Sequence, residues 1–288
     1  MSRDRLGRRV LFLSEAAHTW GGVATWLHEL TLGLPERGWD VYVGLARGRS
    51  FHQPDVYQRA HPHMQIVELD PAHLLPAVRQ NVVGNVLGRL KPQIVVPVNL
   101  FDAFAATVQA KAAGMPVRLV TVHHGFQPLS IDNQKHCAPW IDLAVSVNRL
   151  VARLLGTYAG IAPQRIRHLP SGCPAQDGQP KQRGRQGELT IAYVGRLEQS
   201  EKRVLDAVQL VGELDRLAVN YRFDFVGSGP CEDELRHTLR RPVAAGRVVF
   251  RGYLDRAELL STVYPKLDCV MLFRSEEHTS ELQSHHPI

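Results

Sequence analysis

The sequence has no long hydrophobic run. No apolar stretch reaches the ~18 residues that a membrane-spanning helix needs. The N-terminal segment Met1 to Arg9 is basic and leads directly into a short apolar run, without the apolar core of a signal peptide. We therefore expect a cytoplasmic protein. The basic segments leave open a weak peripheral contact with the inner face of the membrane.

Cysteine is also scarce, and its spacing excludes several classes of site. The chain has 4 cysteines in 288 residues, at Cys137, Cys173, Cys231 and Cys269, and none forms a C-x-x-C pair. This pattern favours free thiols over a disulfide framework or a zinc site. Neither of the strand-end histidines, His123 and His124, pairs with Asp, Cys or another His at a ligand spacing, so we predict no metal site.

The charge is modestly basic, and the composition is that of a globular protein. The formal net charge is +6 and hydrophobic residues make up 44% of the chain. A basic surface suits anionic partners such as nucleotides or phospholipids. No nucleic-acid-binding module and no basic stripe interleaved with aromatic residues is present, so nucleic acid is not an expected partner. The basic segment Lys181 to Arg185 could contact an anionic membrane, but so short a cluster attracts membranes only weakly, and a solvated linker is the favoured interpretation.

Short apolar runs alternate with helical patterns along the whole chain. In the first half, helical spacing covers Val23 to Leu34, and Asp70-Pro71 should open another helix with proline at its first position. The runs expected to be buried strands are Val10–Ser14, Val41–Leu45, Ile94–Val98, Val117–Val122, Leu143–Val147, Leu189–Val194, Tyr221–Val226, Arg247–Phe250 and Cys269–Phe273. Such alternation predicts an α/β fold with doubly wound parallel sheets.

A linker composition divides the chain. The segment from Pro170 to Gly187 is rich in Pro, Gly, Gln and basic residues. We expect a first domain over residues 1–172, a linker over 173–187 and a second domain over 188–273. Two such domains should place a ligand cleft between the carboxyl ends of their strands.

The most informative segment runs from Leu189 to Arg203. A predicted strand ends at a glycine turn, Gly195, which allows close approach of a ligand to the backbone. Arg196 follows at once, and Lys202 is expected in the first turn of the next helix. Cations at a helix N-terminus are unfavourable because they oppose the helix macrodipole, so their presence suggests a function other than stability. Together with the free N–H groups they could bind a phosphate or diphosphate. The alternative is an ordinary strand-turn-helix with solvated basic residues.

Five segments in order resemble the large retaining GT-B glycosyltransferase family often called family 4. They are Trp20-Gly21-Gly22-Val23, Val120 to Gly125, Leu169 to Gly172, Ala192 to Lys202, and the pair Phe225 to Pro230 with Phe250 to Tyr253. The resemblance implies the GT-B fold, with two Rossmann-like domains. It also implies transfer of a sugar from a nucleotide-diphosphate sugar with retention, by front-side displacement, in which Arg196 and Lys202 bind the diphosphate.

The resemblance also implies roles for residues outside that segment. His123 would help to position the sugar ring of the donor, although a strand-end histidine is often purely structural. The glycines of the first loop, Gly21 and Gly22, would face the donor or acceptor, unless they form a plain tight turn. The remaining candidates are placed near the nucleotide, or else serve in packing; they are Gly227, Gly229, Arg251 and Tyr253.

The chain contains no Asp-x-Asp motif, which metal-dependent GT-A enzymes use. We therefore expect a metal-independent reaction with no cofactor beyond the nucleotide sugar as co-substrate. The acceptor is left open among glycans, lipids and small molecules. Two other interpretations stay open: a GT-B sugar-nucleotide epimerase, and a nucleotide-sugar-binding protein without catalysis. A dinucleotide dehydrogenase is disfavoured, since no G-x-G-x-x-G follows either leading strand.

The last residues break the resemblance. After Phe273 the family carries a loop and helix with two glutamates, whereas here Arg274 to Ile288 reads like a translated short-read sequencing adapter. We expect residues 274–288 to be non-native and the second domain to be incomplete. The chain as it stands should then be inactive.

Overall fold

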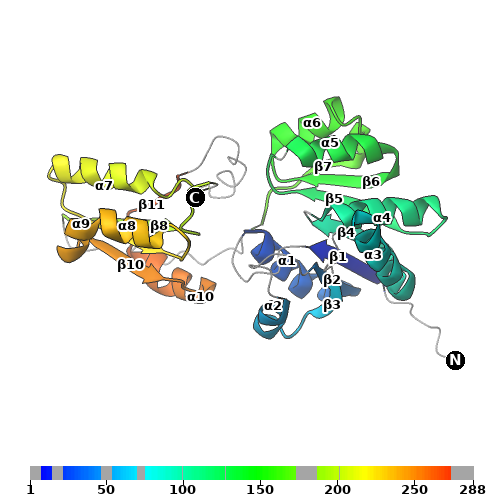
Figure 1. Ribbon diagram of the computed structural model, residues 1–288, viewed down its shortest axis with the longest axis horizontal. Helices are drawn as coiled ribbons and strands as arrows, with labels where there is room; N and C mark the ends of the chain where they lie inside the picture. Colours follow the sequence, from blue (N-terminus) through cyan, green and yellow to red (C-terminus); the bar gives the residue numbers. More distant parts are fainter. Residues whose placement is uncertain are drawn as a thin grey trace. The chain divides into compact units, whose positions relative to one another are not determined.

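The computed structural model describes residues 8–14, 22–46, 54–69, 75–98, 100–126, 128–172, 187–200 and 202–273 (Figure 1). The chain divides into two compact units. The first ends at Gly172, and the described part of the second is 187–273. Residues 274–288, and with them the predicted non-native tail, lie outside the described residues.

The first unit is built on a seven-stranded, fully parallel sheet with the order β3-β2-β1-β4-β5-β6-β7. Its strands are β1 (Arg8–Ser14), β2 (Trp39–Ala46), β3 (Gln65–Leu69), β4 (Ile94–Val98), β5 (Arg118–His123), β6 (Ile141–Ser146) and β7 (Ile166–His168). The five strands predicted from buried apolar runs are confirmed. The two that were missed, β3 and β7, are the edge strands, which are short and only partly buried.

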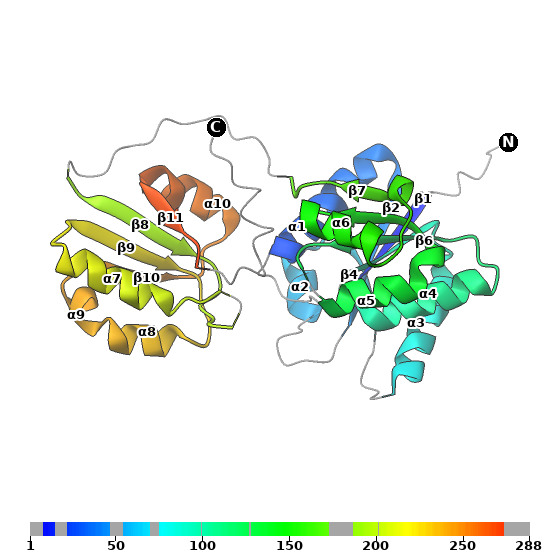
Figure 2. The ribbon, with the colours of Figure 1, turned by 90° about the horizontal axis from the view of Figure 1, so that it is seen from above.

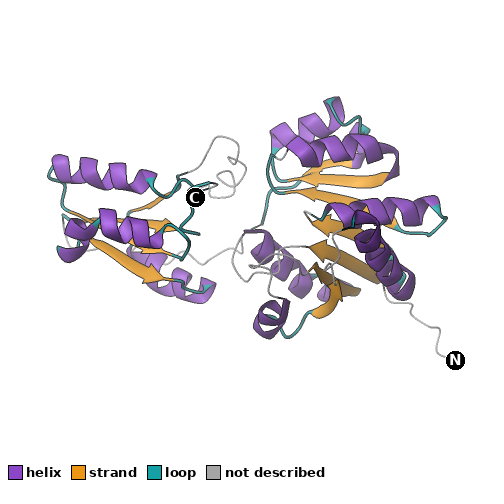
Figure 3. Ribbon diagram, viewed as in Figure 1, coloured by secondary structure: helices purple, strands orange, loops and turns teal. Residues whose placement is uncertain are grey.

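Helices cover both faces of this sheet (Figure 3). They are α1 (Gly22–Gly33), α2 (Pro54–Ala60), α3 (Pro76–Leu90), α4 (Phe101–Ala112), α5 (Pro128–Cys137) and α6 (Arg149–Thr157). Alternate residues of β1 point to opposite faces, as a strand requires. Val10 and Phe12 pack with α1 and α2, whereas Leu11 and Leu13 pack with α3 and α4. The predicted doubly wound α/β architecture is therefore confirmed here.

The helix start predicted at Asp70-Pro71 lies outside the described residues. The helix α3 begins at Pro76, after an extended Leu75. Proline again occupies the first helical position, where its missing N–H costs nothing. Further along, α6 begins with a capped turn, because the side chain of Asn148 accepts hydrogen bonds from the backbone N–H groups of Leu150 and Val151.

The second unit contains a four-stranded parallel sheet with the order β10-β9-β8-β11 (Figure 2). Its strands, all predicted, are β8 (Leu189–Val194), β9 (Tyr221–Val226), β10 (Val248–Gly252) and β11 (Cys269–Met271). Its helices are α7 (Asp206–Arg216), α8 (Glu232–Thr238), α9 (Arg240–Ala244) and α10 (Arg256–Glu258), with a π-helical turn at Leu259–Val263. Tyr193, Phe223 and Phe225 form the centre of its core.

Short 3₁₀ turns complete the described structure, at Pro35–Arg37, Ala138–Trp140, Pro163–Arg165 and Tyr264–Lys266. None of the helices in these ranges is long and apolar enough to cross a membrane.

Candidate functional site

The loops after β8, β9 and β10 lie at one edge of the second sheet, since parallel strands all end on the same side. Gly195 follows β8 and donates its N–H to the carbonyl of Val226, at 2.9 Å. Gly227 follows β9 and donates to the carbonyl of Gly252, at 2.7 Å. These hydrogen bonds continue the ladder beyond the strands and hold the three loops together.

The glycines of the second loop are explained by packing between loops. A Cβ on Gly227, whose φ is +131°, would overlap the carbonyl oxygen of Gly195. A Cβ on Gly229 would overlap that of Leu197. The prediction placed these two glycines against a nucleotide. In the described structure the close approach is to the neighbouring protein backbone, and this alone requires glycine at both positions.

Arg196 extends from a fixed backbone. The hydroxyl of Tyr193, which is buried, donates to the carbonyl oxygen of Arg196 at 2.7 Å. The Arg196 side chain is 46% exposed, and its Nε lies 2.8 Å from Oε2 of Glu198. The backbone of this residue is therefore held by the core, while its guanidinium faces solvent beside one carboxylate.

Lys202 is not in the first turn of a helix, and that prediction is wrong. The helix α7 begins four residues later, at Asp206. Between them Arg203 adopts a left-handed conformation, with φ +49°, which a helix cannot continue through. Arg203 then pairs with Asp206, at 2.7 Å. Lys202 instead lies in a half-buried turn that follows the Arg196 loop, so its charge is not placed in the N-terminal turn of a helix.

Arg251 is engaged with a buried carboxylate. Asp224, in the middle of β9, is only 4% exposed. It accepts hydrogen bonds from Nε of Arg222 at 3.0 Å and from Nε of Arg251 at 2.6 Å. A buried charge needs such partners, so this contact accounts for Arg251 without any ligand. Tyr253, just beyond β10, is 45% exposed.

In the first unit, His123 is the last residue of β5 and is buried. Burial lowers the pKa of His123 to about 4, against a small opposing effect of Gln134. The ring is therefore neutral near pH 7. Its Nε2 is buried and finds no hydrogen-bond partner among the residues that the structure describes, so it is available to a ligand hydroxyl.

The neighbouring His124 contacts Trp26 of α1, with ring centroids 4.6 Å apart. Burial, with the nearby His123, lowers the pKa of His124 to about 4. Of the glycine loop, Gly21 lies outside the described residues, and Gly22 is the exposed first residue of α1. The structure thus holds α1 against the strand-end histidine segment.

Sequence reasoning missed two groups in the first unit. The rings of His28, His61 and His63 pack together, with centroids of the first two 4.6 Å apart. Arg79 and Asp102 form an ion pair, at 2.6 Å, beside a small cavity. The only local signal for either set is the pair His61-Pro62-His63, which His28 joins from a distant part of the chain. Within the described ranges, no group of three or more His, Cys, Asp or Glu side chains is arranged to hold a metal ion.

Several solved structures share this architecture. The lipopolysaccharide outer core galactosyltransferase WaaB is 17% identical, with a TM-score of 0.62 over 92% of this chain and 74% of that chain. HepE of Anabaena, solved with UDP and glucose, is 15% identical, with a TM-score of 0.64 over 96% and 78%. A protein from Listeria monocytogenes, described as a "putative UDP-N-acetylglucosamine 2-epimerase", is 14% identical, with a TM-score of 0.59 over 88% and 71%.

At these identities the likeness establishes the fold alone, which is the two-sheet GT-B architecture predicted from the sequence. No curated protein sequence matches the chain. A family model does match, over residues 20–177, which is more than half of the chain. The chain therefore belongs to Glycosyltransferase Family 4.

Proposed function

We propose that this protein transfers a sugar, with retention, from a nucleotide-diphosphate sugar to an acceptor hydroxyl. The observation that carries the proposal is the loop after β8, where Arg196 projects into solvent from a rigid backbone and Lys202 follows in the next turn. Membership of Glycosyltransferase Family 4 supports a transferase. HepE, which shares the fold, was solved with UDP and glucose.

The proposed chemistry depends on stabilising the leaving diphosphate. The bond between the anomeric carbon and the diphosphate oxygen breaks, the acceptor oxygen bonds to that carbon on the same face, and the acceptor proton passes to the departing phosphate. Negative charge grows on the diphosphate as its bond stretches. Arg196 can bind two phosphate oxygens through its planar guanidinium, and Lys202 supplies a point charge. Placed cations of this kind stabilise the transition state without a metal.

The neutral His123 is assigned to the sugar ring. A buried imidazole with a pKa of about 4 stays uncharged at pH 7. Its Nε2 can then exchange a hydrogen bond with a sugar hydroxyl without adding a charge beside the anomeric carbon. Gly195, Gly227, Gly229 and Tyr253 border the proposed nucleotide side, and Gly21 and Gly22 the start of α1.

The reaction is proposed to need neither a metal nor a further cofactor, and to take place in the cytoplasm, with weak peripheral membrane contact left open. In the protein with its native sequence after Phe273 restored, excess EDTA should leave turnover intact. Loss of activity that Mn²⁺ or Mg²⁺ restores would contradict metal independence.

The alternatives are an epimerase and a non-catalytic binding protein. A fold neighbour from Listeria monocytogenes, described as a "putative UDP-N-acetylglucosamine 2-epimerase", favours the first of them. Calorimetry with UDP and other nucleoside diphosphates, followed by product analysis on a panel of nucleotide sugars, separates the three functions. A new glycosidic product supports the transferase, and an epimerised nucleotide sugar supports the epimerase. Binding without either product supports the binding protein, or the expected inactivity of this chain. Restoring the native sequence after Phe273 from genomic DNA distinguishes these last two.

A further inference from the structure

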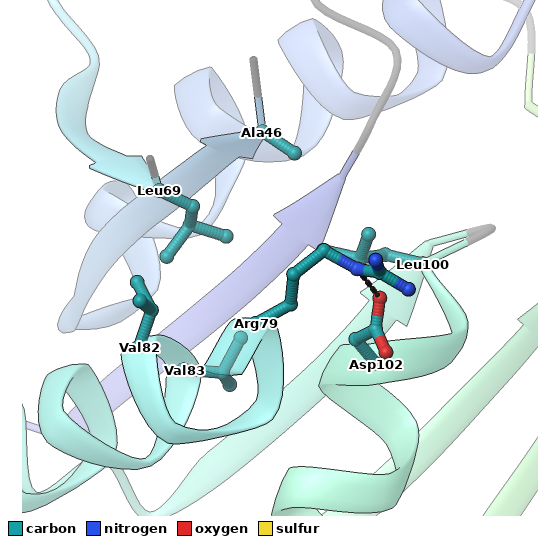
Figure 4. A pocket seen from close by; sticks show the side chains of 7 residues that line it. All are labelled: Ala46, Leu69, Arg79, Val82, Val83, Leu100 and Asp102. Atoms are coloured by element: carbon teal, nitrogen blue, oxygen red, sulfur yellow. Dashed lines mark hydrogen bonds and ion pairs between the residues drawn. The ribbon is translucent and has the colours of Figure 1, made fainter. Parts of the chain in front are cut away.

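A small cavity opens at the carboxyl ends of β2 and β3, between the starts of α3 and α4 (Figure 4). Ala46 and Leu69, the last residues of these strands, form one side of it. The strand order of the sheet reverses nearby, between β1 and β4. In open parallel sheets, ligands bind outside the carboxyl ends of the strands at such a switch point.

The cavity combines apolar walls with one charged pair. Val82 and Val83 of α3 contribute to the walls, as Figure 4 shows. Arg79 reaches across from α3, and its Nε donates to Oδ2 of Asp102 on α4, at 2.6 Å. The two side chains are 29% and 17% exposed. The pair therefore forms the polar side of an otherwise apolar cavity.

Within the described residues, the contacts of Asp102 involve only one of its two carboxylate oxygens. Its Oδ2 is bound by Arg79, and no residue in the described part of the chain donates to its Oδ1. A carboxylate oxygen can only accept, so its ligand must be a donor. An anionic ligand group would be repelled by Asp102, and a cationic one would compete with Arg79. A neutral hydroxyl satisfies both conditions.

The size and surroundings of the cavity limit the choice of ligand further. Its volume is about 20 Å³, which is room for one group the size of a water molecule. Leu75 and Phe101, at the starts of the two helices, are 66% and 48% exposed. The hydroxyl of a hydroxymethyl group fits the cavity, while the ring that carries it lies outside.

We infer that this cavity binds a sugar ring of a carbohydrate acceptor, with its hydroxymethyl hydroxyl donating to Oδ1 of Asp102. The term acceptor rests on the proposed transfer reaction, whereas a carbohydrate can bind in this cavity without a donor. The inference selects glycans among the acceptor classes that the sequence leaves open.

Ligand-observed NMR on the full chain tests the inference without turnover. The probes are methyl α-D-glucopyranoside, methyl α-D-mannopyranoside and methyl β-D-galactopyranoside, each beside its 6-deoxy analogue. At least one glycoside should bind, and its 6-deoxy analogue should bind at least tenfold more weakly. Asp102→Ala should cost at least tenfold in affinity. Val82→Phe should do the same by filling the cavity, with the ion pair intact.

Asp132→Ala is the matched control, because Asp132 is a half-exposed carboxylate of α5 in the same unit; it should leave glycoside binding unchanged. Three results overturn the inference: no glycoside binds, the 6-deoxy analogue binds equally well, or both cavity variants bind as the wild type does. UDP binding on the same samples tests the proposed function separately. UDP binding without glycoside binding removes the cavity site alone, whereas glycoside binding without UDP binding leaves the cavity site standing and places the failure in the second unit.

Discussion

The two units repeat one topology but differ at the edge where their strands end. In each, the first strand lies between the second and the fourth, as β2-β1-β4 and β9-β8-β11. The edge of the second unit consists of glycine loops packed backbone against backbone, with Arg196 exposed above them. The edge of the first carries a neutral buried histidine and exposed apolar residues such as Phe101 and Leu129. On the proposed function, the same fold would bind an anion at one sheet and uncharged groups at the other.

Acid pH should lower the stability of the first unit more than that of the second, and this is the largest difference that we expect between them. Burial lowers the pKa of His123, His124 and His61 to about 4, and all three are in the first unit. Between pH 6.5 and 4 the unfolded state binds protons that the folded state does not, so the free energy of unfolding falls as the pH falls. For the two most buried rings the full loss is on the order of 3 kcal/mol each.

Tryptophan fluorescence measures this loss selectively, because Trp20, Trp26, Trp39 and Trp140 all precede Gly172. Urea unfolding followed by fluorescence should become easier from pH 6.5 to pH 4, and His123→Gln should flatten that slope. A fluorescence transition that does not move over this range would contradict the assignment of neutral, buried histidines.

Loss of the Arg196 cation, at the strand-end edge of the second unit, should weaken nucleotide binding. Arg196→Ala should weaken UDP binding by roughly 10- to 100-fold, and lower turnover by about 10²–10³-fold in an active protein. Melting temperature should change little, since the side chain is half exposed. Arg216→Ala is the control, because Arg216 is also exposed and pairs with a neighbouring glutamate. Equal UDP affinity in both variants would remove Arg196 from the diphosphate site.

The central strands of both units could be predicted from the sequence, because buried parallel strands are continuous apolar runs. The glycine loops after β8 and β9 follow from the glycines at the strand ends and from the family resemblance. The edge strands β3 and β7 could not be predicted, since partly buried strands lack a continuous run.

The misplaced or missed residues depend on tertiary structure. Lys202 was assigned to a helix because nothing in the sequence marks the left-handed Arg203 that delays it. The pair of Arg79 and Asp102 is 23 residues apart and exists only because α3 packs on α4. Such contacts between elements leave no local pattern to read.

The glycine loops allow a stability test within the second unit. A Cβ at Gly229 would overlap the carbonyl of buried Leu197, so Gly229→Ala should cost about 1–3 kcal/mol. In the matched control, Gly212→Ala, the added Cβ on α7 meets nothing within 4 Å. That change should be neutral or stabilise by about 0.4–1 kcal/mol. Urea unfolding followed by circular dichroism measures both, and equal effects would refute packing between the loops.

The smallest expected effect lies at a helix cap in the first unit. The side chain of Asn148 accepts hydrogen bonds from Leu150 N and Val151 N, at 2.7 and 3.3 Å, whereas Leu205 at the start of α7 offers no such cap. Asn148→Ala should therefore cost about 1 kcal/mol in the fluorescence-detected unfolding of the first unit. Asn148→Ser keeps an oxygen that can accept the same bonds and should retain most of the stability. If both substitutions destabilise equally, the loss comes from packing of this buried residue and not from the cap.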